Sequence, residues 1–326
     1  MHTFDYAQLA KRYWDSEILG LVAQIHEYKG RNEQYLQQKP TELDRLIELA
    51  KVQNTEASNA IEGIHITNTH LMQLCADKTT PRNRDEEEIM GYRDVLNTIH
   101  ESYPYIPIKA NYILQLHRDL YKYSEKGIGG RFKNTQNFIS TTDADGNSFV
   151  LFTPLAPYDT PVAVDAICDS LNRELDAQSI NALILIPTFI HDFLCIHPFN
   201  DGNGRMSRLL TTLLLYRSGY MVGKYISLES KIVRNKQLYY DALEKAGLAG
   251  MRTRKTRLRS SSTCCGLSLL RIGILRIRSI WFPRSSPRWK LSAERAGKRS
   301  ANSPRPISWR YILQSGSLRW KTPSKS

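Results

Sequence analysis

Residues 197–208 read His-Pro-Phe-Asn-Asp-Gly-Asn-Gly-Arg-Met-Ser-Arg, and this stretch decides the fold because it predicts a tight turn between two helices. The apolar run over 179–197 has helical spacing. Pro198 disfavours helical backbone at His197, so the first helix should end there. The second helix is expected over 203–218. The pattern therefore predicts two consecutive helices joined by a tight turn, with an imidazole at the end of the first helix.

Two features of this turn suit it to hold a phosphate beside a base. The imidazole of His197, with an unperturbed pKa of about 6.5, is mostly neutral near pH 7 and can accept a proton from a hydroxyl. Gly202, Asn203 and Gly204 leave backbone N–H groups free at the positive end of the second helix, where anions bind. Phe199 is expected to pack inward and anchor the turn.

Three charged side chains complete the predicted site. Asp201 is a single carboxylate beside the anion-binding turn, which is how Mg²⁺ is usually held together with nucleotide oxygens. Arg205 and Arg208 are three positions apart on the first helical turn and can neutralise phosphate oxygens. A histidine at a helix end often only packs, and an aspartate before Gly often only forms a turn. The whole set at this spacing favours phosphoryl or nucleotidyl transfer.

The rest of the body reads as helical with one hairpin. Apolar residues recur three and four positions apart over 6–103, which predicts an all-helical lobe. Two extended runs, 137–141 and 148–152, flank Asp145-Gly146-Asn147, which is a hairpin pattern. Further helices are expected at 109–121, 161–176 and 235–247.

The net charge of +13 is concentrated at the carboxyl end of the 326 residues. Residues 251–326 hold 14 Arg and 5 Lys against one acid, Glu294, so residues 1–250 carry a net charge of −5. A disordered basic arm that binds nucleic acid is one interpretation of this segment. The body itself is mildly acidic.

Cysteine usage and hydropathy indicate the compartment. The odd total and the lack of CxxC spacing support neither a disulfide framework nor a zinc ribbon. The amino terminus has no signal-peptide pattern, and the longest apolar stretch, near 180–190, is too short to cross a bilayer. We therefore expect a reduced, cytoplasmic setting without membrane contact. The cysteines are Cys75, Cys168, Cys195, Cys264 and Cys265.

The turn resembles the motif of Fic-domain proteins, His-x-Phe-x-Asp/Glu-Gly-Asn-Gly-Arg-x-x-Arg. Every specified position is met, by His197, Phe199, Asp201, Gly202, Asn203, Gly204, Arg205 and Arg208. Residues 1–248 are similar to Fic proteins with a helical amino-terminal domain. The resemblance implies a mainly α fold, a Fic-type helical core with one β-hairpin flap, preceded by that domain. The expected division is a helical domain at 1–105, a Fic catalytic domain at 106–248 and a basic tail at 249–326.

The resemblance also implies a protein adenylyltransferase. His197 would deprotonate a Ser, Thr or Tyr hydroxyl of a target protein, which attacks the α-phosphate of ATP so that AMP is transferred and pyrophosphate leaves. Asp201 would hold Mg²⁺, and the hairpin would align the target segment by strand addition. Tyr239 and Tyr240, near Asn235, would lie on the adenine side. The implied ATP-binding residues are Glu62, Gly202, Asn203, Gly204, Arg205, Ser207, Arg208, Tyr239 and Tyr240.

A second match lies upstream, where Ser58-Asn-Ala-Ile-Glu62-Gly63 is similar to the family's inhibitory pattern Ser/Thr-x-x-x-Glu-Gly/Asn. In the family this glutamate pairs with the second arginine of the turn, here Arg208, which stops the γ-phosphate from docking. One guanidinium cannot serve both partners. The alternative is a solvent-facing Glu62 followed by a helix-ending Gly63. We expect autoinhibition by Glu62, within one chain or across a homodimer.

The tail suggests a change of reading frame. Relatives with this architecture often continue with a peptide like Thr-Pro-Phe-Ile-Lys-Tyr-Met-Leu, and codons for it read one base over encode residues 258–265 as they stand here. We hypothesise that the frame is lost between about 247 and 257. The basic charge would then carry no functional meaning.

Three other functions stay open at this point. One is the reverse reaction, in which AMP is removed from a protein and Glu62 positions water. Another is transfer of a different phosphate-containing group on the same fold. The third, from a different class, is a nucleic-acid-binding adaptor that uses the tail; we do not expect nucleic acid as a partner of the body.

Overall fold

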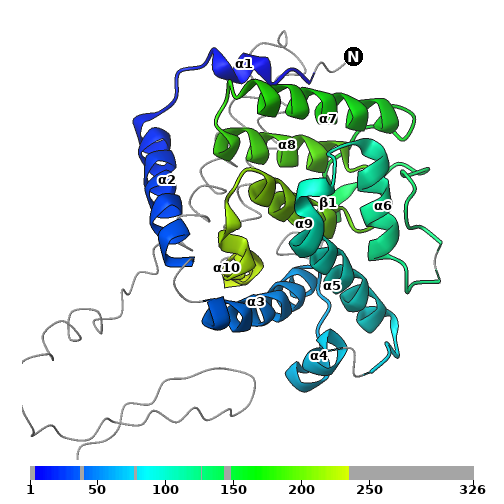
Figure 1. The fold of residues 1–326 in the computed structure, drawn as a ribbon. Coiled ribbons are helices and arrows are strands. Elements are labelled where there is room, and N and C mark those ends of the chain that lie inside the picture. The colour runs from blue at the N-terminus through cyan, green and yellow to red at the C-terminus, as the bar shows by residue number, and fades with distance from the viewer. Residues whose placement is uncertain (1–3, 37–39, 77–78, 126, 143–147, 235–326) are drawn as a thin grey trace, which may run out of the picture. The chain divides into compact units, whose positions relative to one another are not determined.

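The computed structural model describes residues 4–234 apart from 37–39, 77–78, 126 and 143–147. Within these ranges the chain is mainly helical with one pair of strands, which confirms the mainly α fold class (Figure 1). The elements are α1 (Ala7–Ala10), α2 (Ser16–Leu36), α3 (Pro40–Ile61), α4 (Asn68–Cys75), α5 (Arg84–Ser102), η1 (Tyr103–Tyr105), α6 (Ala110–Leu120), β1 (Ile139–Thr142), β2 (Ser148–Phe152), α7 (Thr160–Ala177), α8 (Ala182–Ile196), α9 (Asn203–Arg217), η2 (Met221–Lys224) and α10 (Leu228–Arg234).

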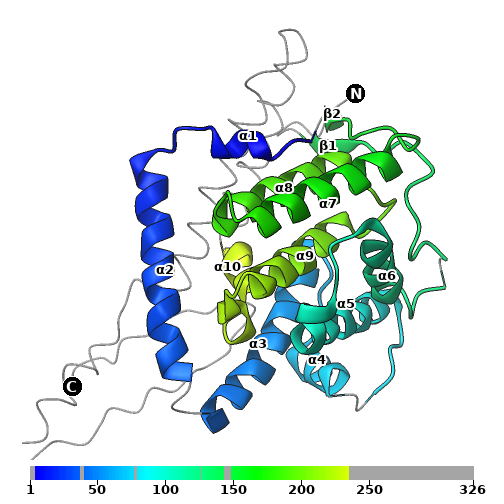
Figure 2. The same cartoon turned by 45° about the horizontal axis from the view of Figure 1, so that its top comes forward.

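Helix α8 is the centre of the core because most of its residues are apolar and most are buried. Phe189 and Phe193 are both 0% exposed. Helix α7 lies beside α8, and α9 packs against α8 from another side (Figures 1 and 2). The turn that joins α8 to α9 therefore leaves the end of a packed helix pair, which fixes where its residues lie.

Helices α5 and α6 cross closely behind this turn. A Cβ atom on Gly91 of α5 would lie 1.9 Å from the carbonyl oxygen of Leu120 in α6, so only glycine permits this crossing. Asn83 caps α5, since its side chain accepts a hydrogen bond from the N–H of Glu86 at 3.0 Å. The crossing brings the amino end of α5 and the carboxyl end of α6 to the turn.

Helix α3 approaches the turn from the other side and packs on α5, α9 and α10. It ends at Ile61, and Gly63 follows with φ +84°. The N–H of Ile64 donates to the carbonyl of Asn59 at 3.0 Å, a hydrogen bond typical of a glycine-terminated helix. Gly63 thus ends the helix, as one interpretation expected, and Glu62 stands at its tip.

The predicted hairpin is present. Strands β1 and β2 pair antiparallel with Thr142 opposite Ser148, and the register shifts between Ile139 and Ser140. The Asp145-Gly146 turn, the expected helix at 235–247 with Tyr239 and Tyr240, and the tail at 249–326 lie outside the described residues. The division at 105 and 248 stays a prediction.

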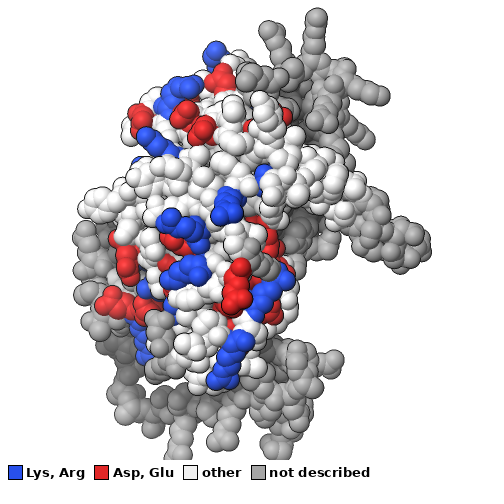
Figure 3. All heavy atoms as spheres, turned by 90° about the vertical axis from the view of Figure 1, so that its right-hand side faces the viewer, with Lys and Arg blue, Asp and Glu red and all other residues white. Residues whose placement is uncertain are grey.

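Acidic and basic side chains are intermixed over the described part of the face in Figure 3. On this face basic side chains have acidic neighbours rather than forming one continuous basic surface. Among the described residues, no helix is long and apolar enough to cross a membrane.

Candidate active site

His197 follows the last residue of α8 in a left-handed conformation, with φ 51° and ψ 63°. This backbone region costs an L-residue about 1–2 kcal/mol, so neighbouring contacts must hold it. Burial lowers the pKa of His197 to about 4; the charge of Lys133 acts in the same direction, and Glu62 and Asp201 act against it. The imidazole is therefore neutral at pH 7 and free to accept a proton.

Gly202 is required by the left-handed backbone of the turn, whereas Gly204 leaves room for the end of a flexible side chain. Gly202 has φ +82°, and a Cβ atom there would lie 2.9 Å from the hydroxyl of Tyr121. A Cβ atom on Gly204, the second residue of α9, would lie 2.3 Å from Oε1 of Glu62. The turn thus leaves the amino end of α9 open, and Glu62 lies over that opening.

A second set of contacts fixes the shape of the turn from inside. Phe199 is fully buried and stacks on His117, with ring centroids 3.7 Å apart and planes 3° from parallel. The N–H of Gly130 donates to Nδ1 of His117, so Nε2 carries the proton and donates to the carbonyl of Asp201 at 3.1 Å. The side chain of Asn203 bonds both the N–H and the carbonyl of Phe199, at 2.9 and 2.8 Å.

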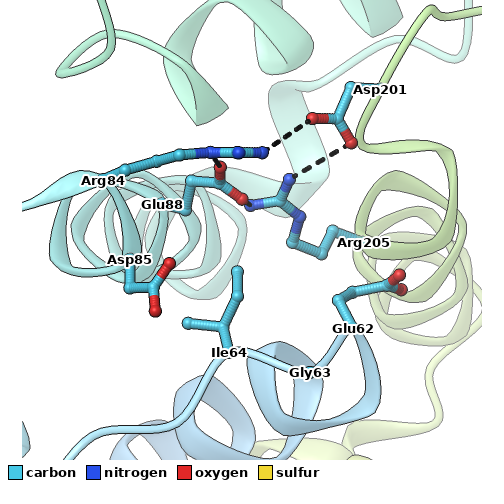
Figure 4. A pocket seen from close by; sticks show the side chains of 8 residues that line it. All are labelled: Glu62, Gly63, Ile64, Arg84, Asp85, Glu88, Asp201 and Arg205. Carbon is cyan, nitrogen blue, oxygen red and sulfur yellow. Dashed lines mark hydrogen bonds and ion pairs between the residues drawn. The ribbon is translucent and has the colours of Figure 1, made fainter.

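Four charged side chains form a ring of alternating sign beside the turn (Figure 4). Glu88 of α5 pairs with Nε of Arg84 at 2.7 Å and with Nη1 of Arg205 at 2.8 Å. Asp201 lies 3.7 Å from Nη2 of Arg84 and 3.8 Å from Nη2 of Arg205. The ring lines a pocket of about 280 Å³ whose other walls include Glu62, Gly63, Ile64 and Asp85.

Arg205 and Glu88 are the buried members of this ring, at 2% and 4% exposed. Besides pairing with Glu88, Arg205 donates to the hydroxyl of Tyr121 at 2.7 Å and stacks over the tyrosine ring, with its Cζ atom 5.3 Å from the ring centroid. Burial raises the pKa of Tyr121, so its hydroxyl stays protonated at neutral pH. Arg205 is thus held rigidly at the wall of the pocket.

The guanidinium of Arg208 forms hydrogen bonds with residues at the end of α3. Its Nε donates to Oγ of Ser58 at 2.7 Å, and its Nη2 donates to the carbonyl of Ser58 at 3.0 Å and to Oε1 of Glu62 at 2.7 Å. Arg208 is 5% exposed, whereas the Glu62 side chain is 36% exposed and reaches the pocket. Glu62 and Arg208 therefore meet within one chain, and Glu62 is not simply a solvent-facing residue.

Most of the predicted site residues come together around the turn, with Ser58, Glu62 and Gly63 against its open side. Four of the predicted residues line the pocket, namely Glu62, Gly63, Asp201 and Arg205, whereas two others bond the protein's own backbone. Ser207 is 1% exposed and donates to the carbonyl of Gly204 at 2.8 Å, and the amide of Asn203 is used to hold Phe199. Their contact with ATP stays a prediction.

Sequence reasoning did not find Arg84, Glu88, His117, Tyr121 or Lys133. The acids after Arg84 have the composition of an ordinary helix start. His117 and Tyr121 are four positions apart on α6, a spacing equally typical of core residues. Only the α5–α6 crossing shows that they face the turn.

Comparison with known families agrees with this geometry. Residues 107–215 match the family model described as Fic/DOC family, a range that includes all of α8 and most of α9. The chain therefore carries a Fic/DOC domain at 107–215, preceded by the helical segment that bears Ser58 and Glu62.

Curated relatives match over part of the chain. The chain is 26% identical over 183 residues to protein adenylyltransferase Fic of Nematostella vectensis, which covers 55% of this chain and 40% of that protein. It is 27% identical over 172 residues to protein adenylyltransferase fic-1 of Caenorhabditis elegans, covering 52% of this chain and 30% of that protein. The matches thus span less than half the length of these relatives.

Solved structures show the same fold. A Fic domain containing signaling protein from Bacteroides thetaiotaomicron superimposes with a TM-score of 0.63 at 25% identity, over 80% of this chain and 94% of that chain. Fic-1 from C. elegans superimposes with a TM-score of 0.61 at 19% identity, over 87% of this chain and 74% of that chain. The latter likeness concerns the fold alone.

Proposed function

We propose that this protein is a protein adenylyltransferase that transfers AMP from ATP to a hydroxyl of a target protein. The observation that carries the proposal is the neutral imidazole of His197, held beside the open amino end of α9. The curated names of the two relatives, both protein adenylyltransferases, support the same reaction.

The chemistry follows from the positions of the side chains. His197 accepts the proton of a Ser, Thr or Tyr hydroxyl as the oxygen bonds to the α-phosphorus of ATP. The bond from that phosphorus to the bridging oxygen breaks, and pyrophosphate leaves with its electron pair. The free N–H groups at the start of α9 and the guanidinium of Arg205 stabilise the charge that develops on the phosphate oxygens.

The residues present fit a bound Mg²⁺. Asp201 offers a hard oxygen donor, its side chain is 40% exposed at the pocket, and Oδ1 is oriented by the N–H of Gly202 at 2.7 Å. One carboxylate with nucleotide oxygens is a usual ligand set for this ion. When bound there, Mg²⁺ would neutralise phosphate charge.

Glu62 would inhibit the reaction in this conformation. Nε and Nη2 of Arg208 already donate to Ser58 and Glu62, so a γ-phosphate that needs the same guanidinium has to compete with these oxygen atoms. The pairing is made in cis, and it needs no second copy of the chain. Release of Glu62 would expose Arg208 to ATP.

The test is intact-mass analysis after incubation with ATP and Mg²⁺. We expect Glu62→Gly to gain one adenylyl unit faster than the parent, and we expect no gain in Glu62→Gly combined with His197→Ala or when EDTA is added. Glu56→Gly on the same helix α3, whose side chain is exposed, is the matched control. Equal labelling with and without His197 would reject the proposal.

The reverse reaction is favoured by one observation, namely that the Glu62 carboxylate reaches the same pocket as Asp201. A carboxylate there can position water for removal of AMP from a modified protein. Incubating an AMPylated chain with and without Glu62→Gln distinguishes the two directions. We further propose a reduced, cytoplasmic setting, because the thiols of Cys168 and Cys195 form no disulfide among the described residues.

A further inference from the structure

Lys133 is a buried ammonium group that the reaction scheme above does not use. It is 3% exposed, and burial lowers its pKa to about 8, with no carboxylate of the described residues acting on it. Burying an unpaired charge is costly unless hydrogen bonds satisfy it. Its Nζ donates to the carbonyl oxygen of Ile196 at 2.8 Å.

The same residue makes a second contact through its backbone. The N–H of Lys133 donates to the carbonyl oxygen of Pro198 at 2.8 Å. Ile196 is the last residue of α8, so its carbonyl lies at the negative end of a helix, where a cation is favoured. Lys133 therefore donates hydrogen bonds to the carbonyl groups of the residues on either side of His197.

His197 needs such support because of its left-handed backbone, with φ 51°. Its own N–H is bonded to the carbonyl of Phe193 at 2.9 Å. With this N–H and the carbonyls of Ile196 and Pro198 all fixed, the strained conformation is determined from three directions. We propose that Lys133 is the positioning residue that holds His197 in its catalytic orientation. This inference rests on the proposed role of His197 as the base.

Lys133 also acts on the charge of the imidazole. The charged groups that face His197 are Lys133, Glu62 and Asp201; the lysine lowers its pKa and the two acids raise it, on top of a larger lowering by burial. Removing the ammonium should therefore raise the pKa of His197. Lys133→Arg keeps the positive charge and a hydrogen-bond donor. Rescue by this variant therefore distinguishes a role of charge and hydrogen bonding from a role of side-chain packing alone.

The experiment compares Lys133→Met with Lys133→Arg in full-length protein that carries Glu62→Gly. We expect Lys133→Met to lower kcat for AMP transfer by about 100-fold, the loss typical of a misplaced catalytic group, with the KM for ATP unchanged. Lys133→Arg should restore most of kcat. Lys109→Met, which removes an exposed lysine at the start of α6, is the control. Circular dichroism melting establishes that each variant is folded.

A second readout does not depend on activity. NMR titration of the His197 ring should show a higher pKa in Lys133→Met than in Lys133→Arg or the control. If Lys133→Met does not fold, Lys133→Gln takes its place, because it removes the charge while keeping a donor. Unchanged kcat and an unchanged His197 titration in a folded charge-removing variant would overturn the inference. Absence of AMP transfer in all chains, the Lys133 parent included, would instead reject the proposed function and leave the NMR comparison to decide the role of Lys133.

Discussion

Arg208 and Ser58, 150 positions apart in the sequence, are joined by two hydrogen bonds, one to the hydroxyl and one to the carbonyl of the serine. The second bond uses a nitrogen of Arg208 that also donates to Glu62. The end of α3 therefore contributes three oxygen atoms to one guanidinium. Of the two residues that supply these oxygen atoms, Ser58 is buried, at 0% exposed, and Glu62 is the exposed one.

Ser58→Ala should relieve part of the inhibition. The substitution removes the bond to Nε and leaves the serine carbonyl and Glu62 in place, so its effect should be smaller than that of Glu62→Gly. A lost hydrogen bond to a charged group is worth on the order of 1–2 kcal/mol, which corresponds to a rise of about 5- to 30-fold in self-labelling with radioactive ATP. Thr98→Ala, which removes a hydroxyl bonded within its own helix α5, serves as the control. A rate equal to that of the parent would show that Glu62 inhibits without Ser58.

Much of this site was predictable from the sequence, and the reasons for the rest are physical. Pro198 shows that α8 ends, and the glycines after it predict an open helix start, because both effects are local. The sequence does not show that His197 becomes left-handed, since that depends on Lys133, 64 positions upstream. Likewise, nothing near Glu88 indicates that it pairs with Arg205, because the packing of α5 against α9 brings them together.

The pH dependence of AMP transfer should reflect the buried state of His197. Its pKa is lowered to about 4, mainly by burial, so the neutral base persists well below the unperturbed value of about 6.5. The profile of kcat/KM for the target protein, which reports the free enzyme, should stay flat from pH 7.5 to about pH 6 in the Glu62→Gly chain. Because ATP gains a proton in this range, kcat/KM for the target is measured at saturating ATP and Mg²⁺. An acid limb with its midpoint near the unperturbed value would contradict this expectation.

Stability should fall as the pH is lowered, because a second histidine is buried in its neutral form. His100, at the end of α5, is 3% exposed beside the hydroxyl of Tyr216, and burial lowers its pKa to about 3. The unfolded chain binds a proton at this residue below about pH 6.5 while the folded chain does not, so the free energy of unfolding decreases by up to about 1.4 kcal/mol per pH unit below that point. Urea unfolding at pH 7, 6 and 5 should show a shallower decline in His100→Gln than in the parent. An identical decline would mean that His100 is not held neutral in the folded state.

Among glycine-to-alanine substitutions in the helices, Gly91→Ala should lower the free energy of unfolding the most. The added Cβ would lie 1.9 Å from the backbone oxygen of Leu120, and a backbone atom cannot turn aside as a side chain can. Overpacking of this kind costs about 1–3 kcal/mol or more, and any relaxation must separate α5 from α6, which carry Glu88 and His117. Gly20→Ala in α2 is the matched control, because nothing lies within 4 Å of its new methyl group and the change should stabilise the helix by about 0.5–1 kcal/mol. Urea unfolding of the two variants should therefore move the midpoint in opposite directions. Equal midpoints would show that α5 and α6 do not cross as closely as the structure has them.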